Sequence, residues 1–498
     1  MTPSVLPTRV AIVTLGCGRN EVDSANAAGL LAASGYEVVD DPETADAVVV
    51  NTCAFIEAAR RESVETVLDA SGLKEQGRAK AVVVMGCLAE RYTEELRIEL
   101  PEADAVVPFA DYARLSEVLG GTLGNPPPGA AAPVVGAPPG RAALAPPAGR
   151  RALPLVFPTP PGRSFPARQP VGGPVACVKL AEGCDRDCSF CAIPSFRGPF
   201  RSRRPTEVLD EVAWLAGQGV SEVVLVAENS TSYGKDLGGR SALIQLLREL
   251  VGVDGLRRVR LQYLQPDELA PGLLEEMAAN PVVCSYFDLS LQHASEPVLR
   301  RMRRGGSRAA FLDLVARVRA LDPDAAFRSN FILGFPGERA ADVRELEAFL
   351  EDARLDWVAF FPYSPEEGTA AVALDGRVPA RTARARVERL QELQERLLAG
   401  TQASWLGRRL EVLVERVDGD GAEGRSFREG PESDGIVRVP ALTGAAVGDY
   451  VEVEVTAADG AELLARPLRF PADTPVGAPR ARASRRAAGK LAAGRAGG

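Results

Sequence analysis

Two stretches of this chain alternate strand-like and helix-like segments, and that alternation restricts the fold to few classes. Residues 9–120 form the first stretch, in which short Val-rich runs end in Gly, Asn or Cys. Such runs are typical of buried parallel strands. The predicted strands are Arg9–Leu15, Ala47–Asn51 and Ala81–Met85, and helices are expected near 22–34, 57–70 and 88–99. The pattern predicts an N-terminal open-sheet α/β domain over residues 8–121.

The alternation returns at about residue 173 and continues to about residue 400. The predicted strands are Ala176–Leu180, Glu222–Val226, Val259–Tyr263, Tyr286–Leu291, Ala326–Leu333 and Trp357–Pro362. Helical patterns separate these strands, as in a parallel (β/α) barrel or partial barrel. We assign this central domain to residues 173–401, with a long closing helix over Arg381–Gly400.

Three further segments have a different character. Residues 122–172 are dominated by Pro, Gly and Ala, which predicts a disordered linker that buries no core. Residues 402–471 alternate apolar and polar residues between Gly-rich turns, a pattern typical of a small antiparallel β-barrel. Residues 472–498 are basic and low in complexity, which predicts a disordered tail.

Composition limits the chemistry that the chain can carry. A chain of 498 residues exceeds one hydrophobic core, in agreement with three domains. It has eight cysteines but one histidine, so mixed Cys and His zinc sites are disfavoured. No apolar run is long enough to span a membrane, and the N-terminus lacks the features of a secretory signal. We therefore expect a cytoplasmic protein, in which closely spaced thiols bind metal more often than they form disulfides.

The most specific motif is EGCDRDCSFCAIPSFRG, residues 182–198, which follows a predicted strand. Its cysteines are Cys184, Cys188 and Cys191, spaced C-x3-C-x2-C. Three thiolates on one loop can hold three irons of a 4Fe-4S cluster and leave the fourth iron open to a cofactor or substrate. The alternative is a structural zinc knuckle, which normally needs a fourth nearby ligand. Cys177, seven residues upstream, lies inside a predicted strand.

A second set of cysteines is spread along the N-terminal domain. Cys17, Cys53 and Cys87 each follow a predicted parallel strand. Ligand sites lie at the carboxyl ends of such strands, so these three thiols could converge. The alternative from spacing alone is three buried cysteines that act as small apolar residues.

The order of the motifs resembles the methylthiotransferase family of radical S-adenosylmethionine enzymes. The matching segments are GCGRNEVDS, NTCAF, MGCLAERY, EGCDRDCSFCAIPSFRG, ENSTSYGKD, SLQHASEPVLRRMRR, FILGFPGE and YSPEEGT. The similarity covers nearly all of residues 8–470 except the linker. It implies an auxiliary 4Fe-4S cluster on Cys17, Cys53 and Cys87, and a second 4Fe-4S cluster that binds S-adenosylmethionine on Cys184, Cys188 and Cys191. It also implies that the last domain is a substrate-contacting TRAM barrel. The Gly after Cys17 departs from the Pro or Ala more usual there.

The resemblance also suggests which side chains hold S-adenosylmethionine. Polar residues at strand ends of the central domain are the candidates. They are Glu228, Asn229, Ser290, Gln292 and Arg328.

Basic residues after the cluster loop are a further candidate group. They could neutralise an anionic substrate or a cofactor carboxylate, or could be solvated surface charge. They are Arg197, Arg201, Arg203 and Arg204.

Two observations favour the branch of the family that modifies the β-carbon of an aspartate in the small-subunit ribosomal protein of the decoding centre. GCGRNEVDS, CAIPSFRG and YSPEEGT are closer to that branch than to the branch that modifies tRNA. Residues 402–470 contain 8 Arg or Lys and 13 Asp or Glu, a net charge of 8 − 13 = −5. An acidic barrel suits a basic ribosomal protein better than tRNA phosphates.

The family mechanism implies a low-potential electron donor such as flavodoxin or ferredoxin. Two alternatives remain open: a tRNA methylthiotransferase that acts on the adenosine beside the anticodon, and a non-catalytic iron–sulfur factor that binds ribosomes or RNA. The basic tail could contact ribosomal RNA or be dispensable.

Overall fold

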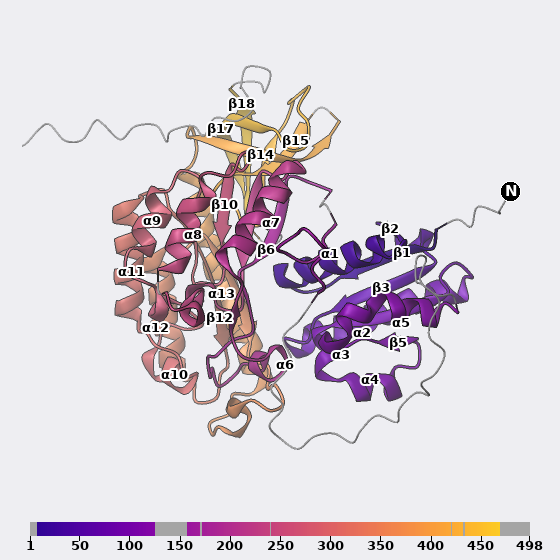
Figure 1. The fold of residues 1–498 in the computed structure, drawn as a ribbon. Helices are drawn as coiled ribbons and strands as arrows, with labels where there is room; N and C mark the ends of the chain where they lie inside the picture. The colour runs from indigo at the N-terminus through magenta and orange to yellow at the C-terminus, as the bar shows by residue number, and fades with distance from the viewer. Residues whose placement is uncertain are drawn as a thin grey trace, which may run out of the picture.

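The computed structural model describes residues 7–124, 157–169, 172–239, 241–419, 421–431 and 434–468. These residues form an N-terminal α/β sheet, a central partial barrel with helices on its outside, and a closed β-barrel at one end of the central strands (Figure 1). The three-part architecture predicted from the sequence is confirmed. No helix among the described residues is long and apolar enough to cross a membrane.

The N-terminal sheet is fully parallel, with strand order β2-β1-β3-β4-β5. Its central strands β3 and β4 are buried at every position because helices cover the sheet. Two short strands, β2 and β5, were missed by the sequence pattern, and α1 begins four residues before its predicted start. The elements are β1 Arg9–Thr14, α1 Gly18–Ala33, β2 Glu37–Val39, β3 Ala47–Thr52, α2 Glu57–Glu75, β4 Ala81–Gly86, α3 Cys87–Arg91, α4 Thr93–Glu99, β5 Ala105–Val106 and α5 Leu115–Thr122.

The central domain contains two parallel three-stranded sheets, ordered β10-β9-β6 and β11-β12-β13. Isolated bridges between Val259 and Val283 and between Leu264 and Leu289 connect them, so the six strands form one open barrel. The strands are β6 Val175–Lys179, β9 Glu222–Val226, β10 Arg258–Leu261, β11 Tyr286–Asp288, β12 Ala326–Leu333 and β13 Trp357–Pro362.

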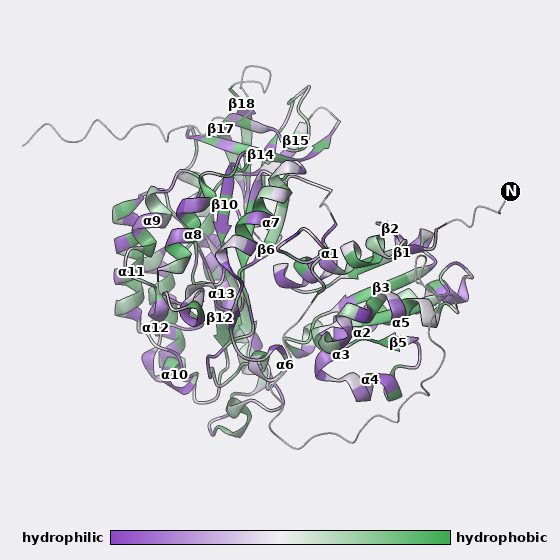
Figure 2. Cartoon of the chain, viewed as in Figure 1, coloured by the Kyte–Doolittle hydropathy of each residue, from purple (hydrophilic) through white to green (hydrophobic). Residues whose placement is uncertain are grey.

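Helices cover the outer face of this barrel (Figure 1). They carry both hydrophobic and hydrophilic residues, as expected of helices with one buried face (Figure 2). They are α7 Pro205–Gly217, α8 Ala242–Leu250, α9 Leu273–Ala279, α10 Glu296–Arg301, α11 Arg308–Leu321, α12 Ala340–Ala353 and α13 Ala380–Ala403. A short hairpin of β7 Ala181–Glu182 and β8 Arg201–Ser202 encloses the loop with the C-x3-C-x2-C motif and helix α6 Ile193–Arg197.

The C-terminal domain is a closed barrel with strand order β14-β15-β16-β18-β17. The strands β16 and β18 pair in parallel, so the purely antiparallel barrel predicted from the sequence is wrong at this one pair. The barrel docks near the amino ends of the central strands, where Glu222 begins β9 and Trp357 begins β13. The strands are β14 Arg409–Asp418, β15 Gly421–Arg425, β16 Val437–Val439, β17 Tyr450–Asp459 and β18 Glu462–Pro467.

The predicted linker over 122–172 needs a correction at its carboxyl end. Residues 157–169 pack between the first two domains, with Phe157 and Phe165 buried. The Arg168 guanidinium pairs with Glu211 of α7 at 2.5 Å, and the backbone N–H of Gln169 donates to the carbonyl of Ala25 in α1. The prediction used the average composition of 122–172, in which the two buried Phe residues are outweighed by Pro, Gly and Ala. The rest of the predicted linker, 125–156 and 170–171, and the predicted tail over 472–498 lie outside the described residues.

Candidate metal centres and the interface between them

The three cysteines of the N-terminal domain lie at the same edge of its sheet. Cys17 precedes α1, Cys53 follows β3, and Cys87 begins α3 directly after β4. The strands β1, β3 and β4 are neighbours in register, so their carboxyl ends place the three thiols together.

Asn20 connects the three loops that carry these cysteines, a role that sequence reasoning missed. Its Nδ2 donates to the carbonyl of Leu15 at 2.7 Å and to that of Thr52 at 3.1 Å. The Cys87 thiol lies 3.8 Å from its Oδ1. A single buried amide therefore fixes the relative positions of the Cys17, Cys53 and Cys87 segments.

Gly86 sets the turn that delivers Cys87. Its φ is +97°, and a Cβ there would lie 2.4 Å from the carbonyl oxygen of Thr52. A side chain at this position would therefore meet both backbone strain and a direct clash. The N–H of Gly86 donates to the Tyr112 hydroxyl at 2.6 Å, which holds the turn against α5 and its preceding segment.

Cys184, Cys188 and Cys191 lie on the loop between β7 and α6. The N–H of Cys184 donates to the carbonyl of Gly198 at 3.1 Å, and that of Cys191 donates to the carbonyl of Cys188 at 3.1 Å. Arg304 lies beside the loop, with its Nη1 3.9 Å from the Cys188 sulfur. The loop is therefore closed by its own backbone, and its thiols are partly exposed.

The thiols fit iron–sulfur ligation better than a single-ion site. Burial raises the pKa of Cys53 to about 12, of Cys184 to about 11 and of Cys191 to about 12. Metal binding would thus displace a proton from each of these thiols. Among the described residues, no three His, Cys, Asp or Glu side chains are grouped to hold one metal ion. A cubane instead distributes its thiolates over separate irons.

Arg197 enters the seam between the two sets of thiols. It ends α6, six residues after Cys191, and its side chain is 1% exposed. Its Nη2 lies 3.2 Å from the Cys87 sulfur and 2.9 Å from Asn20 Oδ1. The alternative that Arg197 is solvated surface charge is wrong, because the N-terminal domain encloses its guanidinium.

A network of buried charges surrounds Arg197. Its Nη1 donates to Glu182 at 3.2 Å and its Nη2 to Asp23 of α1 at 3.3 Å. Lys179, at the end of β6, pairs with Asp23 and lies 2.5 Å from Glu182. Glu228 completes the group at 3.6 Å from both the Arg197 Nε and the Arg19 Nε. Asp23 pairs with Lys179 and Arg197 across 156 and 174 positions of the chain, so no local pattern predicts these two contacts.

A second ionic contact joins the two domains near the Cys53 and Cys87 segments. Glu366, in the loop after β13, is 2% exposed and pairs with Arg60 of α2 and, at 2.9 Å, with Arg91 of α3. Arg91 also donates to the carbonyl of Ala54 at 3.1 Å. The YSPEEGT segment therefore contacts the helix that follows Cys53 and the helix that begins at Cys87.

Four of the five predicted S-adenosylmethionine contacts lie at the carboxyl ends of the strands. The buried Glu228 carboxylate has no hydrogen-bond donor within the described residues, and the Asn229 amide donates to Glu268 at 2.9 Å. Ser290 and Gln292 follow β11. Their positions on β9 and β11 place them on the same side of the barrel as the cysteine loop.

Arg328 lies elsewhere in the barrel. It occupies the third position of β12 and pairs with Asp288 at 3.5 Å and with Asp434 of the C-terminal barrel at 3.4 Å. It therefore connects the central strands to the C-terminal domain.

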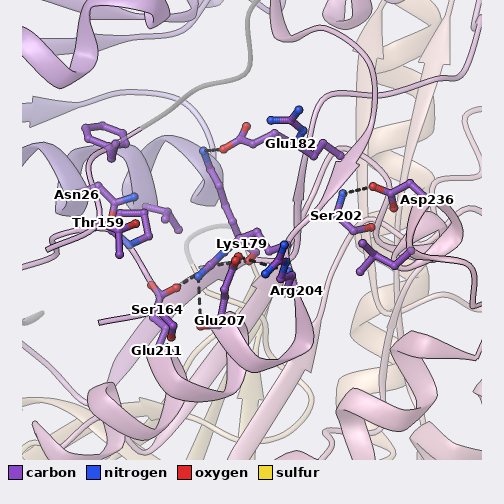
Figure 3. A pocket seen from close by; sticks show the side chains of 16 residues that line it. Asn26, Thr159, Ser164, Lys179, Glu182, Ser202, Arg204, Glu207, Glu211 and Asp236 are labelled. Carbon is purple, nitrogen blue, oxygen red and sulfur yellow. Dashed lines mark hydrogen bonds and ion pairs between the residues drawn. The ribbon is translucent and has the colours of Figure 1, made fainter. Parts of the chain in front are cut away.

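A cavity of about 550 Å³ opens beside the buried network. It lies among α1, the 157–166 segment, β8 and α7, and Lys179 and Glu182 form part of its wall (Figure 3). Figure 3 also shows Ser164, Glu207 and Glu211 among the residues that line it. The 157–169 segment, predicted to be a linker, thus forms one wall of this cavity.

Comparison with known proteins agrees with this architecture. Residues 9–108 match the Uncharacterized protein family UPF0004, 178–350 the Radical SAM superfamily, and 406–468 the TRAM domain. A protein named ribosomal protein uS12 methylthiotransferase RimO from Nocardioides sp. (strain JS614) is 51% identical, over 92% of this chain and 97% of the relative. RimO of Streptomyces coelicolor is 48% identical over 92% of this chain and 96% of the relative. RimO of Kineococcus radiotolerans is 50% identical over 92% and 97%, respectively.

Among solved structures, the radical S-adenosylmethionine methyltransferase TsrM from Kitasatospora setae is similar with a TM-score of 0.49 and 17% identity, over 72% of this chain and 74% of that chain. The family assignment depends instead on the full-length relatives at about half identity and on the three matching domains. The chain is a radical S-adenosylmethionine enzyme, and it belongs to the RimO family of methylthiotransferases.

Proposed function

We propose that this chain transfers a methylthio group to the β-carbon of an aspartate in ribosomal protein uS12. The observation that carries the proposal is the 48–51% identity to uS12 methylthiotransferases across 92% of the chain. The net charge of −5 over residues 402–470 supports a basic protein partner over tRNA, because an acidic surface repels phosphates.

We also propose that the chain holds two 4Fe-4S clusters. Cys17, Cys53 and Cys87 would hold one of them at the edge of the N-terminal sheet. The other would be held by Cys184, Cys188 and Cys191 on the loop before α6. When bound, these clusters and S-adenosylmethionine would supply a carbon-centred radical and a methylated sulfur.

Several residues of the chain would prepare the site for that chemistry. Glu228 and Asn229 would hold the methionyl ammonium of S-adenosylmethionine. The Glu228 side chain is 3% exposed, and its carboxylate has no hydrogen-bond donor among the described residues, with the nearest guanidinium nitrogens at 3.6 Å. Ser290 and Gln292 would contact its ribose. In the same seam, Arg197 and Lys179 compensate the charges of Asp23 and Glu182.

The partners follow from this chemistry. A low-potential donor, flavodoxin or ferredoxin, would supply electrons to the clusters. A ribosomal protein substrate implies a cytoplasmic site of action, on free uS12 or on the ribosomal particle. The basic residues after 471 would contact ribosomal RNA in the second case.

The test is anaerobic incubation of the loaded chain with uS12, S-adenosylmethionine and a reductant, followed by mass spectrometry of the aspartate-containing peptide. We expect a methylthio adduct on uS12 and none on uS12 in which that aspartate is replaced. The Cys188→Ala variant should form neither the adduct nor 5′-deoxyadenosine.

Methylthio-adenosine in tRNA with unmodified uS12 would refute the substrate assignment. Stoichiometric binding of uS12 without consumption of S-adenosylmethionine would refute the enzymatic assignment. Iron analysis should give about eight irons per chain, and about four in Cys188→Ala.

A further inference from the structure

Arg197 belongs to the loop region of one thiol triad but contacts a thiol of the other. It lies at the end of α6, which begins two residues after Cys191. Its Nη2 is 3.2 Å from the Cys87 sulfur, while its Nε and Nη1 face Glu228 and Glu182. The guanidinium therefore joins the helix that follows one cysteine loop to the Cys87 sulfur of the N-terminal domain.

The surroundings make this contact strong. The Arg197 side chain is 1% exposed, so water does not compete for its N–H groups. Its guanidinium packs 5.1 Å from the centre of the Phe109 ring, which fixes its plane. In a site with low effective dielectric, a charge-assisted hydrogen bond to sulfur is stronger than at the surface.

We propose that Arg197 is a positioning residue that sets the reduction potential of the auxiliary cluster through the Cys87 sulfur; the inference rests on the proposed ligation of that cluster. Reduction adds one electron from a low-potential donor and increases the negative charge of the cluster and its thiolates by one. A cation that donates a hydrogen bond to a ligand sulfur stabilises the reduced form more than the oxidised form. The potentials of such clusters respond to net charge and to hydrogen bonds on sulfur.

The neighbouring charges predict the direction in which each substitution should shift the midpoint potential. In the intact network the three formal cations Arg19, Lys179 and Arg197 face the three carboxylates of Asp23, Glu182 and Glu228. Removal of Arg197 leaves one excess negative charge beside Cys87. Removal of the charge on Glu182 has the opposite effect on the same site.

The experiment isolates the auxiliary cluster in the full-length chain with Cys184, Cys188 and Cys191 all replaced by Ala. This parent should hold about four irons. In that background we would compare Arg197→Gln, Arg197→Lys, Glu182→Gln and Arg168→Gln. The readout is the midpoint potential from a dithionite titration followed by electron paramagnetic resonance, which requires no catalytic turnover.

Arg168→Gln is the matched control. Its side chain is also 1% exposed and pairs with one carboxylate, Glu211, at the same domain seam. It removes a buried cation that pairs with carboxylate rather than sulfur. Its midpoint should equal that of the parent, whereas a purely structural effect would move both variants alike.

We expect Arg197→Gln to favour the oxidised form at least tenfold, a shift of about 59 mV to more negative potential for one electron. Arg197→Lys should shift it less, because the charge stays while the planar fork is lost. Glu182→Gln should shift the midpoint to more positive values.

An Arg197→Gln midpoint equal to that of the parent, at equal iron content, would overturn the inference. If Arg197→Gln does not retain iron, the midpoint potential of Glu182→Gln tests the inference instead. A Glu182→Gln midpoint equal to or more negative than that of the parent would overturn it. A parent without iron would refute the proposed ligands of the auxiliary cluster themselves, an outcome distinct from a failed shift.

Discussion

Replacement of Glu222 by Gln tests how the C-terminal barrel is attached to the central strands. Glu222 is 0% exposed at the start of β9, and its Oε1 lies 3.0 Å from Arg425 Nη1 of β15 and 3.2 Å from Arg260 Nε of β10. Arg258 lies 3.8 Å from the other oxygen. One carboxylate thus compensates three buried or nearly buried guanidinium groups from two domains.

The magnitude follows from the pKa of this carboxyl. Burial alone would raise it, but Arg425, Arg260 and Arg258 outweigh burial and lower the pKa of Glu222 from 4.5 to about 2. A lowered pKa stabilises the fold above pH 4.5, and this stabilisation is lost as the pH falls from 4.5 toward 2. At neutral pH the shift corresponds to about 3 kcal/mol. Removal of the charge leaves Arg260 without a carboxylate partner among the described residues, while Arg425 and Arg258 keep Glu415 and Glu411. A loss of about 3 kcal/mol is expected.

The assay is urea unfolding at neutral pH followed by tryptophan fluorescence. Two of the three tryptophans lie at this seam and should report its loss. The Trp357 indole donates to the carbonyl of Arg428, and the Arg428 guanidinium packs on the Trp405 ring. Since a chain of several domains need not unfold in one step, loss of the contact should produce an earlier separate transition.

Glu411→Gln is the matched control at the same seam. Its side chain is 41% exposed and pairs with Arg257 at 3.0 Å and with Arg258 at 3.6 Å. Because solvent screens an exposed carboxylate, its replacement should cost less than about 1 kcal/mol. If Glu222→Gln costs no more than Glu411→Gln, the seam does not depend on the buried carboxylate and the reasoning is refuted.

Three further outcomes are expected. Gly86→Ala should lose about half of the iron, because its Cβ would collide with the Thr52 carbonyl. The control Gly121→Ala, whose Cβ meets open space, should keep about eight irons. Equal iron in both variants would contradict the role of the Gly86 turn. Burial raises the pKa of Asp434 from 3.8 to about 6, so its folded form binds the proton more tightly and its contribution to stability falls as the pH rises through this window. Asp434→Asn should remove about 3 kcal/mol of that pH dependence, measured by urea unfolding at both ends of the window. Glu366→Gln removes the ion pairs with Arg60 and Arg91, so hydrogen exchange should increase in residues 364–369 and stay unchanged in β3. If the loop exchanges as slowly as in the parent, these ion pairs do not hold it.

Regular elements and ligand cysteines could be predicted from the sequence because their signals are local. Glu222–Val226, Ala326–Leu333 and Trp357–Pro362 begin and end as predicted. The six cysteines of the two triads could be placed at strand ends or in one loop from spacing alone. The assignment of their ligand roles came from the family resemblance.

The contacts between domains could not be predicted in this way. Arg197 is one of four arginines within eight positions, and no local pattern distinguishes it from Arg201 or Arg204, which are exposed. Its partners lie more than 100 positions away, at Asn20, Asp23 and Cys87. Burial of a charge is decided by the partner surface, so composition and periodicity carry no information about it.

Two ionic contacts between the N-terminal domain and the barrel lie beside cysteines, next to apolar contacts in which Ile193 and Phe196 of α6 join the N-terminal core. Arg197 meets Asp23 and Cys87 on one side, and Glu366 meets Arg91 beside the Cys53 loop on the other. Apolar side chains of similar volume would avoid the cost of desolvating these charges, so stability alone does not account for them. Guanidinium–carboxylate pairs have a fixed direction and distance, which apolar contacts lack. We infer that these ionic pairs orient the two domains and so keep the two thiol triads in one alignment. A change of Glu366 that loosens its loop should therefore impair methylthio transfer before it unfolds either domain.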